Sequence, residues 1–83
     1  MHNLTATSKK IMELFGYFRI KQGDVLTWKL FLTRRHLWND LEEQEVQDAL
    51  GELIQNRYIE SMEEPAGWRL LDNGWQYIKK LRR

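Results

Sequence analysis

The residue types that perform catalysis or hold metal ions occur in this 83-residue chain only at spacings that suit neither task. His2 and His36 are far apart and form no HxxxH or HExxH pair, and cysteine is absent, so neither a metal site nor a thiol nucleophile is expected. The five glycines form no phosphate-cradling loop, and there is no G-x-S-x-G sequence. Glu42, Glu43 and Glu45 fall in the first turn of a predicted helix, where the helix dipole favours acids, and do not resemble a general acid–base pair. We therefore expect a non-enzymatic protein with no metal and no cofactor.

The charges along the chain are segregated, although the formal net charge is only +1. Residues 1–39 carry a net charge of +5, residues 40–64 carry −8, and residues 65–83 carry +4. Asymmetry of this kind is typical of chains that meet a charged partner.

Length and composition predict a single globular domain over residues 1–83, with 42% hydrophobic and 30% charged residues. The longest strictly apolar run, residues 30–32, is too short to cross a membrane, so no membrane association is expected. The first residues lack the basic start and apolar stretch of a signal peptide. Because the absence of cysteine also fits a reducing compartment, we expect a cytoplasmic location.

Hydrophobic spacing predicts four helices, at about residues 8–21, 27–37, 41–56 and 73–82. In the first helix, apolar residues recur at i, i+3, i+4 and i+7: Ile11, Leu14, Phe15 and Phe18. Thr7 or Ser8 is expected to cap its start, and Gly23 to stop it. Val25 and Leu26 then form either a very short strand or a bend.

The second and third helices are predicted from caps as well as from spacing. Thr27 is expected to cap the second helix, whose apolar face holds Trp28, Phe31, Leu32 and His36. Asn39 or Asp40 is expected to cap the third, with Asp40 and Glu43 as a capping box. The buried stripe of the third helix is expected to be Val46, Ala49, Leu50, Leu53 and Ile54. Asn56, which tolerates the left-handed conformation, is expected to end it.

A β-hairpin is predicted at about residues 58–71, with an alternating segment, a turn around Pro65 and a returning strand. Asp72 is expected to cap the last helix, which would bury Trp75, Ile78 and Leu81. The predicted fold is mainly α with a small β-hairpin, in the order helix-helix-helix-hairpin-helix. Two helices joined by a short turn and followed by a ribbon are the arrangement of helix-turn-helix modules with a wing.

Two stretches of the chain resemble the winged-helix (winged helix-turn-helix) superfamily. The stretch Glu42–Glu60 resembles the third helix and first wing strand of that superfamily, with the sequence EEQEVQDALGELIQNRYIE. The stretch Gly67–Leu81 resembles the second wing strand and final helix, with the sequence GWRLLDNGWQYIKKL. A fainter likeness to a segment of phage and plasmid replication proteins lies in LTWKLFLTRRHLWNDL (Leu26–Leu41). The resemblance implies a small bacterial or phage DNA-binding protein acting in transcription regulation or mobile-element replication.

The resemblance also implies that the third helix enters the major groove of double-stranded DNA. Its outer face would then offer glutamine amides to adenine edges, from Gln44, Gln47 and Gln55. Gly51 would allow a backbone or phosphate to approach. The candidate phosphate contacts are Arg34, Arg35, Arg57 and Arg69.

Acidic residues on the same surface favour an alternative. Carboxylates that would repel a phosphate backbone are expected on the third helix and the wing, at Asp48, Glu52, Glu60, Glu63 and Glu64. The alternative is a winged-helix protein–protein interaction module whose acidic third helix and wing bind a basic partner. The sequence leaves both functions open.

Several aromatic and apolar residues lie off the predicted buried faces. Trp68 and Trp75 are expected to close the core, whereas one of Trp28 and Trp38 is expected to be partly exposed. Off the main faces of the first and last helices lie Met12, Tyr17 and Tyr77. If these three are exposed and adjacent, they mark a dimer or partner surface. The resemblance implies that a homodimer would form through the first and last helices.

Overall fold

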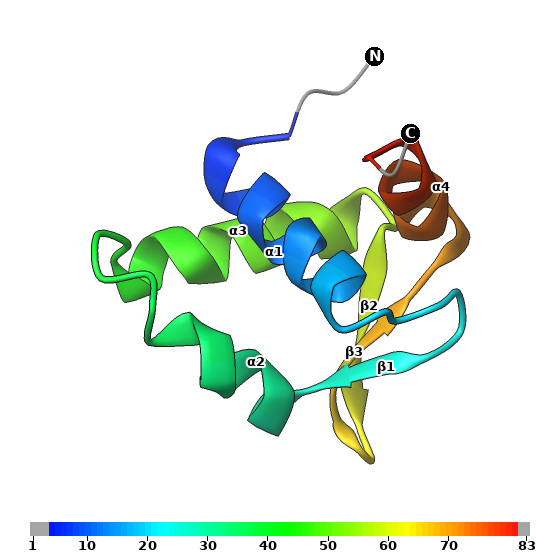
Figure 1. The fold of residues 1–83 in the computed structure, drawn as a ribbon, viewed down its shortest axis with the longest axis horizontal. Coiled ribbons are helices and arrows are strands. Elements are labelled where there is room, and N and C mark those ends of the chain that lie inside the picture. The colour runs from blue at the N-terminus through cyan, green and yellow to red at the C-terminus, as the bar shows by residue number, and fades with distance from the viewer. Residues whose placement is uncertain (1–3, 82–83) are drawn as a thin grey trace.

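The computed structural model describes residues 4–81, which form four helices and a three-stranded antiparallel sheet (Figure 1). The helices are α1 (Ala6–Tyr17), α2 (Trp28–Arg35), α3 (Glu43–Gln55) and α4 (Asp72–Leu81). The strands are β1 (Val25–Thr27), β2 (Ile59–Glu63) and β3 (Ala66–Leu70). The mainly helical class and the hairpin of β2 and β3 are confirmed.

The core lies where α1, α3, α4 and the sheet meet. Helix α1 packs against α3 and α4, while α2 packs mainly against β1 and β3 and contacts α1 through Arg34 and Tyr17. The fully buried large side chains come from every layer: Ile11, Met12, Phe15, Leu26, Phe31, Leu53, Ile59, Leu70 and Ile78. Because Met12 is among them, its predicted place on an exposed dimer surface is wrong.

Helix α1 is shifted towards the N-terminus relative to the prediction. The Thr5 side chain, and not Thr7 or Ser8, caps it by accepting a hydrogen bond from the Ser8 N–H. The helix ends at Tyr17 because Arg19 adopts a left-handed backbone (φ 58°) and the Ile20 N–H bonds back to the Phe15 carbonyl. The predicted end near residue 21 is therefore wrong.

Residues 25–27 form a strand that pairs with β3, a contact that the sequence alone did not predict. The register places Val25 opposite Arg69 and Leu26 opposite Trp68, and the sheet order is β1-β3-β2. Gly67 makes this pairing possible, because a Cβ there would collide with the carbonyl oxygen of Leu26. The predicted two-stranded ribbon is thus the larger part of a three-stranded sheet.

Thr27 caps helix α2 as predicted, and the Thr27 hydroxyl accepts a hydrogen bond from the Leu30 N–H at 3.3 Å. The helix ends at Arg35, not near residue 37, and Phe31 is its one fully buried residue. The predicted apolar face is wrong for Leu32, which is 44% exposed, and for His36, which is also exposed. Trp28 is 39% exposed and Trp38 half-buried, which confirms that one of these two rings is partly exposed.

Helix α3 buries Val46, Ala49, Leu50 and Leu53 as predicted, but Ile54 is 38% exposed. Three details of its ends differ from the prediction. Glu42 occupies the N-cap with no side-chain hydrogen bond, so the caps at Asn39 or Asp40 and the capping box are wrong. The helix ends at the Asn56 C-cap as predicted, but the left-handed residue is the next one, Arg57 (φ 61°).

Helix α4 begins at Asp72, one residue before the predicted start, and the predicted end at residue 82 lies outside the described residues. Ile78 is buried and Trp75 half-buried, whereas Leu81 is 50% exposed and so does not belong to the core. Trp68 is buried as predicted, against the rings of Phe31 and Trp28 at centroid distances of 4.9 and 5.5 Å.

Candidate functional site

The outer face of α3 is exposed and carries no basic side chain. It consists of Gln44, Gln47, Asp48, Gly51 and Gln55. The Gln44 amide donates to an Asp48 carboxylate oxygen at 2.8 Å, and the Gln47 amide donates to Glu43 at 3.3 Å. Two of the three candidate base readers therefore already satisfy a neighbouring carboxylate. A shallow hollow runs along the second half of this face, and nothing lies within 4 Å of a Cβ built on Gly51.

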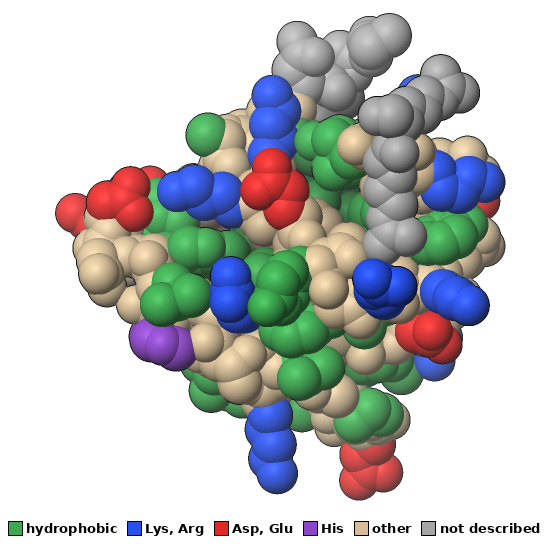
Figure 2. All heavy atoms as spheres, in the orientation of Figure 1, with side chains coloured by type: hydrophobic (Ala, Val, Ile, Leu, Met, Phe, Trp, Pro, Cys, Tyr) green, Lys and Arg blue, Asp and Glu red, His purple; other side chains and the backbone are tan. Residues whose placement is uncertain are grey.

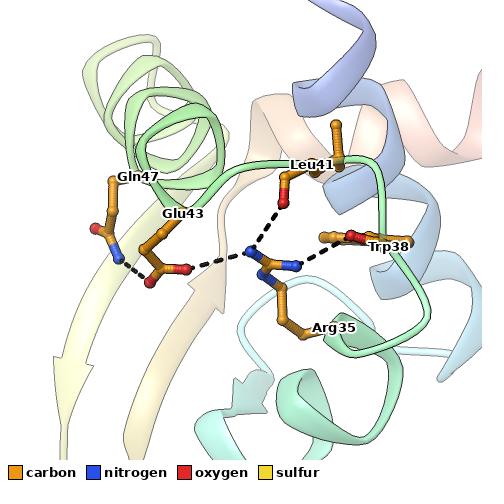
Figure 3. A network of polar contacts seen from close by, with 5 residues as sticks. All are labelled: Arg35, Trp38, Leu41, Glu43 and Gln47. Atoms are coloured by element: carbon orange, nitrogen blue, oxygen red, sulfur yellow. Dashed lines mark hydrogen bonds and ion pairs between the residues drawn. The ribbon is translucent and has the colours of Figure 1, made fainter.

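Arg35 holds the turn between α2 and α3 instead of projecting into solvent (Figure 3). Its guanidinium donates to the Trp38 carbonyl at 3.4 Å, to the Leu41 carbonyl at 3.5 Å and to a Glu43 carboxylate oxygen at 3.3 Å. Figure 3 shows these three groups converging on it, with Gln47 on the far side of Glu43. Arg35 therefore positions the start of α3, a role that sequence spacing did not reveal.

Arg34, the neighbouring residue, faces α1. Its guanidinium carbon lies 4.4 Å from the centroid of the Tyr17 ring, and the side chain is half-buried. This is a cation–π contact between α2 and α1. The two arginines expected to touch phosphate thus diverge, one towards α1 and the other towards α3.

The hairpin surface is acidic at its tip. Arg69 pairs with Glu60 across β2 and β3 at 3.1 Å, as their register positions require. Glu63 and Glu64 are exposed beside the turn, and Arg57 is exposed where α3 leads into β2. We call Asp48, on the outer face of α3, and Glu60, Glu63 and Glu64, on the hairpin and its turn, together the acidic surface. Among the predicted phosphate contacts, Arg57 is the one whose side chain has no intramolecular partner among the described residues. Its backbone N–H donates to the Ile54 carbonyl.

Glu52 lines the hollow of α3 beside Asp48, and its carboxylate also makes contacts within the molecule. Its carboxylate accepts the hydroxyl of buried Ser8 at 2.5 Å and that of Thr5 at 3.4 Å. Glu52 therefore ties the start of α1 to α3. Its predicted contact with a basic partner stays a prediction.

Lys and Arg side chains, mixed with Asp and Glu, are spread over the face on which α1 and α2 lie (Figure 2). Between these helices lies a groove lined by Lys10, Glu13, Leu14, Tyr17, Arg34, Leu37 and Trp38. Tyr17 is 60% and Leu37 53% exposed, and Figure 2 shows hydrophobic side chains gathered over this part of the molecule. The signal in the sequence was Leu37, which does not fit the helical period of the second helix.

Tyr77 lies against Tyr58 on another face, with their ring centroids 5.9 Å apart. Burial, the nearby Glu13 carboxylate and Tyr58 raise the pKa of Tyr77 above its ordinary value of 10.0. A phenol with a raised pKa stays neutral at physiological pH, so Tyr77 contributes packing against Tyr58 and no charge.

Within residues 4–81, no group of three or more His, Cys, Asp or Glu side chains is arranged to hold a metal ion. Over the same residues, every helix is too short or too polar to cross a lipid bilayer. No protein-family model matches the chain, and neither a curated protein nor a solved structure matches it. The function is therefore inferred from the chain's own residues.

Proposed function

We propose that this chain is a non-enzymatic winged-helix module that binds a basic protein partner through its acidic surface. The order α1-β1-α2-α3-β2-β3 and the hairpin after α3 support the winged-helix assignment. The connection between α2 and α3 spans residues 36–42, which is longer than the three or four residues of a simple helix-turn-helix. In this arrangement α3 would be the helix presented to a partner and the β2–β3 hairpin the wing.

The proposal rests on which charged side chains are held by contacts within the molecule and which are exposed to a partner. Three of the four arginines expected to touch phosphate are held by groups within the molecule: Arg34 by Tyr17, Arg35 by Glu43 and two carbonyls, and Arg69 by Glu60. In contrast, Asp48, Glu63 and Glu64 are exposed, and the neutral Gln44 amide that bonds to Asp48 does not neutralise its charge.

This division disfavours DNA at α3, because affinity for DNA comes largely from cations that neutralise phosphates. The same carboxylates would attract lysines and arginines of a protein, and complementary charge raises both the rate and the specificity of association. A protein with a basic surface is therefore the partner that these groups suit best.

The test compares two variants with the same change of charge. Asp48→Lys lies on the acidic surface, whereas Asp24→Lys is exposed in the loop before β1. Affinity capture from a lysate of the producing cells, quantified by mass spectrometry, should return a basic protein with the wild type and with Asp24→Lys, and lose it with Asp48→Lys. Retention of that partner by Asp48→Lys, and also by a combined Glu63→Lys and Glu64→Lys variant, would refute the proposal.

Double-stranded DNA is the second candidate ligand, and it would connect the chain to transcription regulation or mobile-element replication. Its support is the exposed row of Gln44, Gln47 and Gln55 on α3, together with exposed Lys29 beside the hairpin turn. Binding of mixed-sequence duplex DNA at low salt, measured by fluorescence polarisation and weakened by Arg57→Ala and Lys29→Ala, would favour it. These two residues are better probes than Arg35, because substituting Arg35 also loosens the turn before α3.

A further inference from the structure

The groove between α1 and α2 has an apolar floor and exposed apolar walls. Leu14 and Trp38 form the floor, since Leu14 is buried and Trp38 half-buried. Tyr17 and Leu37 form the walls and expose more than half of their surfaces. The groove encloses about 340 Å³, which is room for several side chains. An exposed apolar groove of this kind is typical of a site for an amphipathic helix.

The walls of the groove are held in place by the turn that follows α2. The Leu37 and Trp38 N–H groups donate to the Arg34 and Arg35 carbonyls, each at 3.0 Å, and Arg35 returns a hydrogen bond to the Trp38 carbonyl. The contact of Arg34 with Tyr17 links the two helices at the same place. A site built from fixed groups loses less conformational entropy when a ligand binds than a mobile one does.

The charges around the groove are predominantly positive. Lys10 and Arg34 line it, against one acid, Glu13. No described residue supplies a carboxylate partner to Arg34, whose fork of N–H donors suits a carboxylate in two-point contact. A ligand with carboxylates flanking its apolar residues would complete both the charge and the apolar contacts.

A second copy of the chain fits this groove poorly. Placing two such grooves face to face would oppose Lys10 and Arg34 of one copy to the same residues of the other. The acidic elements α3 and the hairpin expose one large hydrophobic side chain among the described residues, Ile54, so they lack the apolar stripe that the groove requires. A nucleic acid is also disfavoured, because the floor is apolar and Arg34 already covers one face of the Tyr17 ring.

We propose that the groove between α1 and α2 is a docking site for an acidic amphipathic helix of a partner protein. The partner would insert leucine or aromatic side chains at i and i+4 between Tyr17 and Leu37, and place Asp or Glu side chains against Arg34 and Lys10. This site is distinct from the acidic surface of α3 and the hairpin and does not depend on it. The module would then hold two partners of opposite charge on different faces.

The experiment uses a fluorescein-labelled helical peptide with leucine and tryptophan at i and i+4 and with Asp and Glu at the flanking positions. A scrambled peptide of the same composition is the control ligand. Anisotropy titration should show saturable binding of the first peptide, weakened by salt, and much weaker binding of the scrambled one. Amide chemical-shift changes should be centred on Lys10, Leu14, Tyr17 and Trp38.

Matched variants on α1, on α2 and in the turn after α2 locate the site. Leu37→Ser should weaken binding by about tenfold, whereas Leu32→Ser, at an exposed leucine of α2 outside the groove, should change it less than about twofold. Lys10→Glu should weaken binding by several-fold and Lys29→Glu should leave it unchanged. All four residues are at least partly exposed, so the variants are expected to fold.

The proposal is overturned if the peptide does not bind up to about millimolar concentration, or if the scrambled peptide binds equally well. Equal effects of Leu37→Ser and Leu32→Ser on peptide binding would also overturn it. So would displacement of the peptide by a mixed-sequence single-stranded oligonucleotide at equal concentration. A dimer in light scattering that Leu37→Ser dissolves would assign the groove to a second copy and overturn it as well. Asp48→Lys should leave peptide affinity unchanged, so failure here is distinguishable from failure of the acidic-surface proposal.

Discussion

Ser8 in α1 donates its hydroxyl to the carboxylate of Glu52 in α3 over 2.5 Å, and this contact joins residues that are 44 positions apart. Ser8 is fully buried, and its hydroxyl also lies 3.4 Å from the Ala49 carbonyl. The pair fixes the start of α1 against α3, because the Thr5 hydroxyl that caps α1 also reaches Glu52.

Ser8→Ala should lower the free energy of unfolding by about 1.5–3 kcal/mol, because it removes a hydrogen bond to a charged group from a buried position. Urea denaturation followed by circular dichroism measures this loss. Ser61→Ala, at an exposed serine of β2, is the matched control and should stay within about 0.5 kcal/mol of the wild type. Equal stability of the two variants would contradict the role assigned to this contact.

Glycine should stabilise the ends of α1 and α3 when it replaces the arginines that close them. Arg19 and Arg57 hold left-handed backbone conformations, which cost a non-glycine residue free energy. Arg19→Gly and Arg57→Gly should each raise the free energy of unfolding by about 0.5–1 kcal/mol, measured by thermal denaturation. Lys21→Gly, which has no such conformation to relieve, should not stabilise the protein. A loss of stability in both arginine variants would contradict this prediction.

The glycines of α3 and α4 should respond oppositely to alanine. Gly51 is exposed with open space beside it, so Gly51→Ala should stabilise α3 by about 0.5–1 kcal/mol through helix propensity. Gly74 is buried, and a Cβ there would collide with the Tyr58 carbonyl oxygen and the Leu70 side chain. Gly74→Ala should therefore destabilise the protein by about 1–3 kcal/mol. Denaturant unfolding of both variants checks the opposite signs, and equal signs would refute the packing of α4 on Tyr58.

Stability should fall in strongly alkaline solution because of Tyr77. Since burial, Glu13 and Tyr58 raise the pKa of Tyr77, the folded protein holds the phenolic proton more tightly than the unfolded chain does. This difference has no effect well below the ordinary value of 10.0 and reduces stability as the pH rises through the folded pKa. Tyr77→Phe should lessen this alkaline loss, measured by urea denaturation at neutral and alkaline pH. An unchanged slope would contradict the assignment.

Local patterns along the chain predicted most of the elements but not their partners. The i, i+3, i+4, i+7 spacing identified the buried stripe of α3, and Thr27 identified the start of α2. Errors gathered at helix ends, where Arg19 and Arg57 adopt conformations for which their residue type gives no signal. The strand β1 was ambiguous, because three residues carry little periodicity and their pairing with β3 is a long-range contact.

The candidate site likewise combines features that the residue types predicted with contacts that only the fold creates. Residue types alone separated the acidic middle of the chain from its basic flanks and placed Gln44, Gln47 and Asp48 together on one helix face. Only the tertiary structure decided that Arg34 lies on Tyr17, that Arg35 braces a turn and that Glu52 turns inward to Ser8. Helical period and charge are properties of neighbouring residues, so the sequence determines them directly. The partner of a long charged side chain depends on which distant segment the fold brings within reach, and that is decided by the packing of the whole domain.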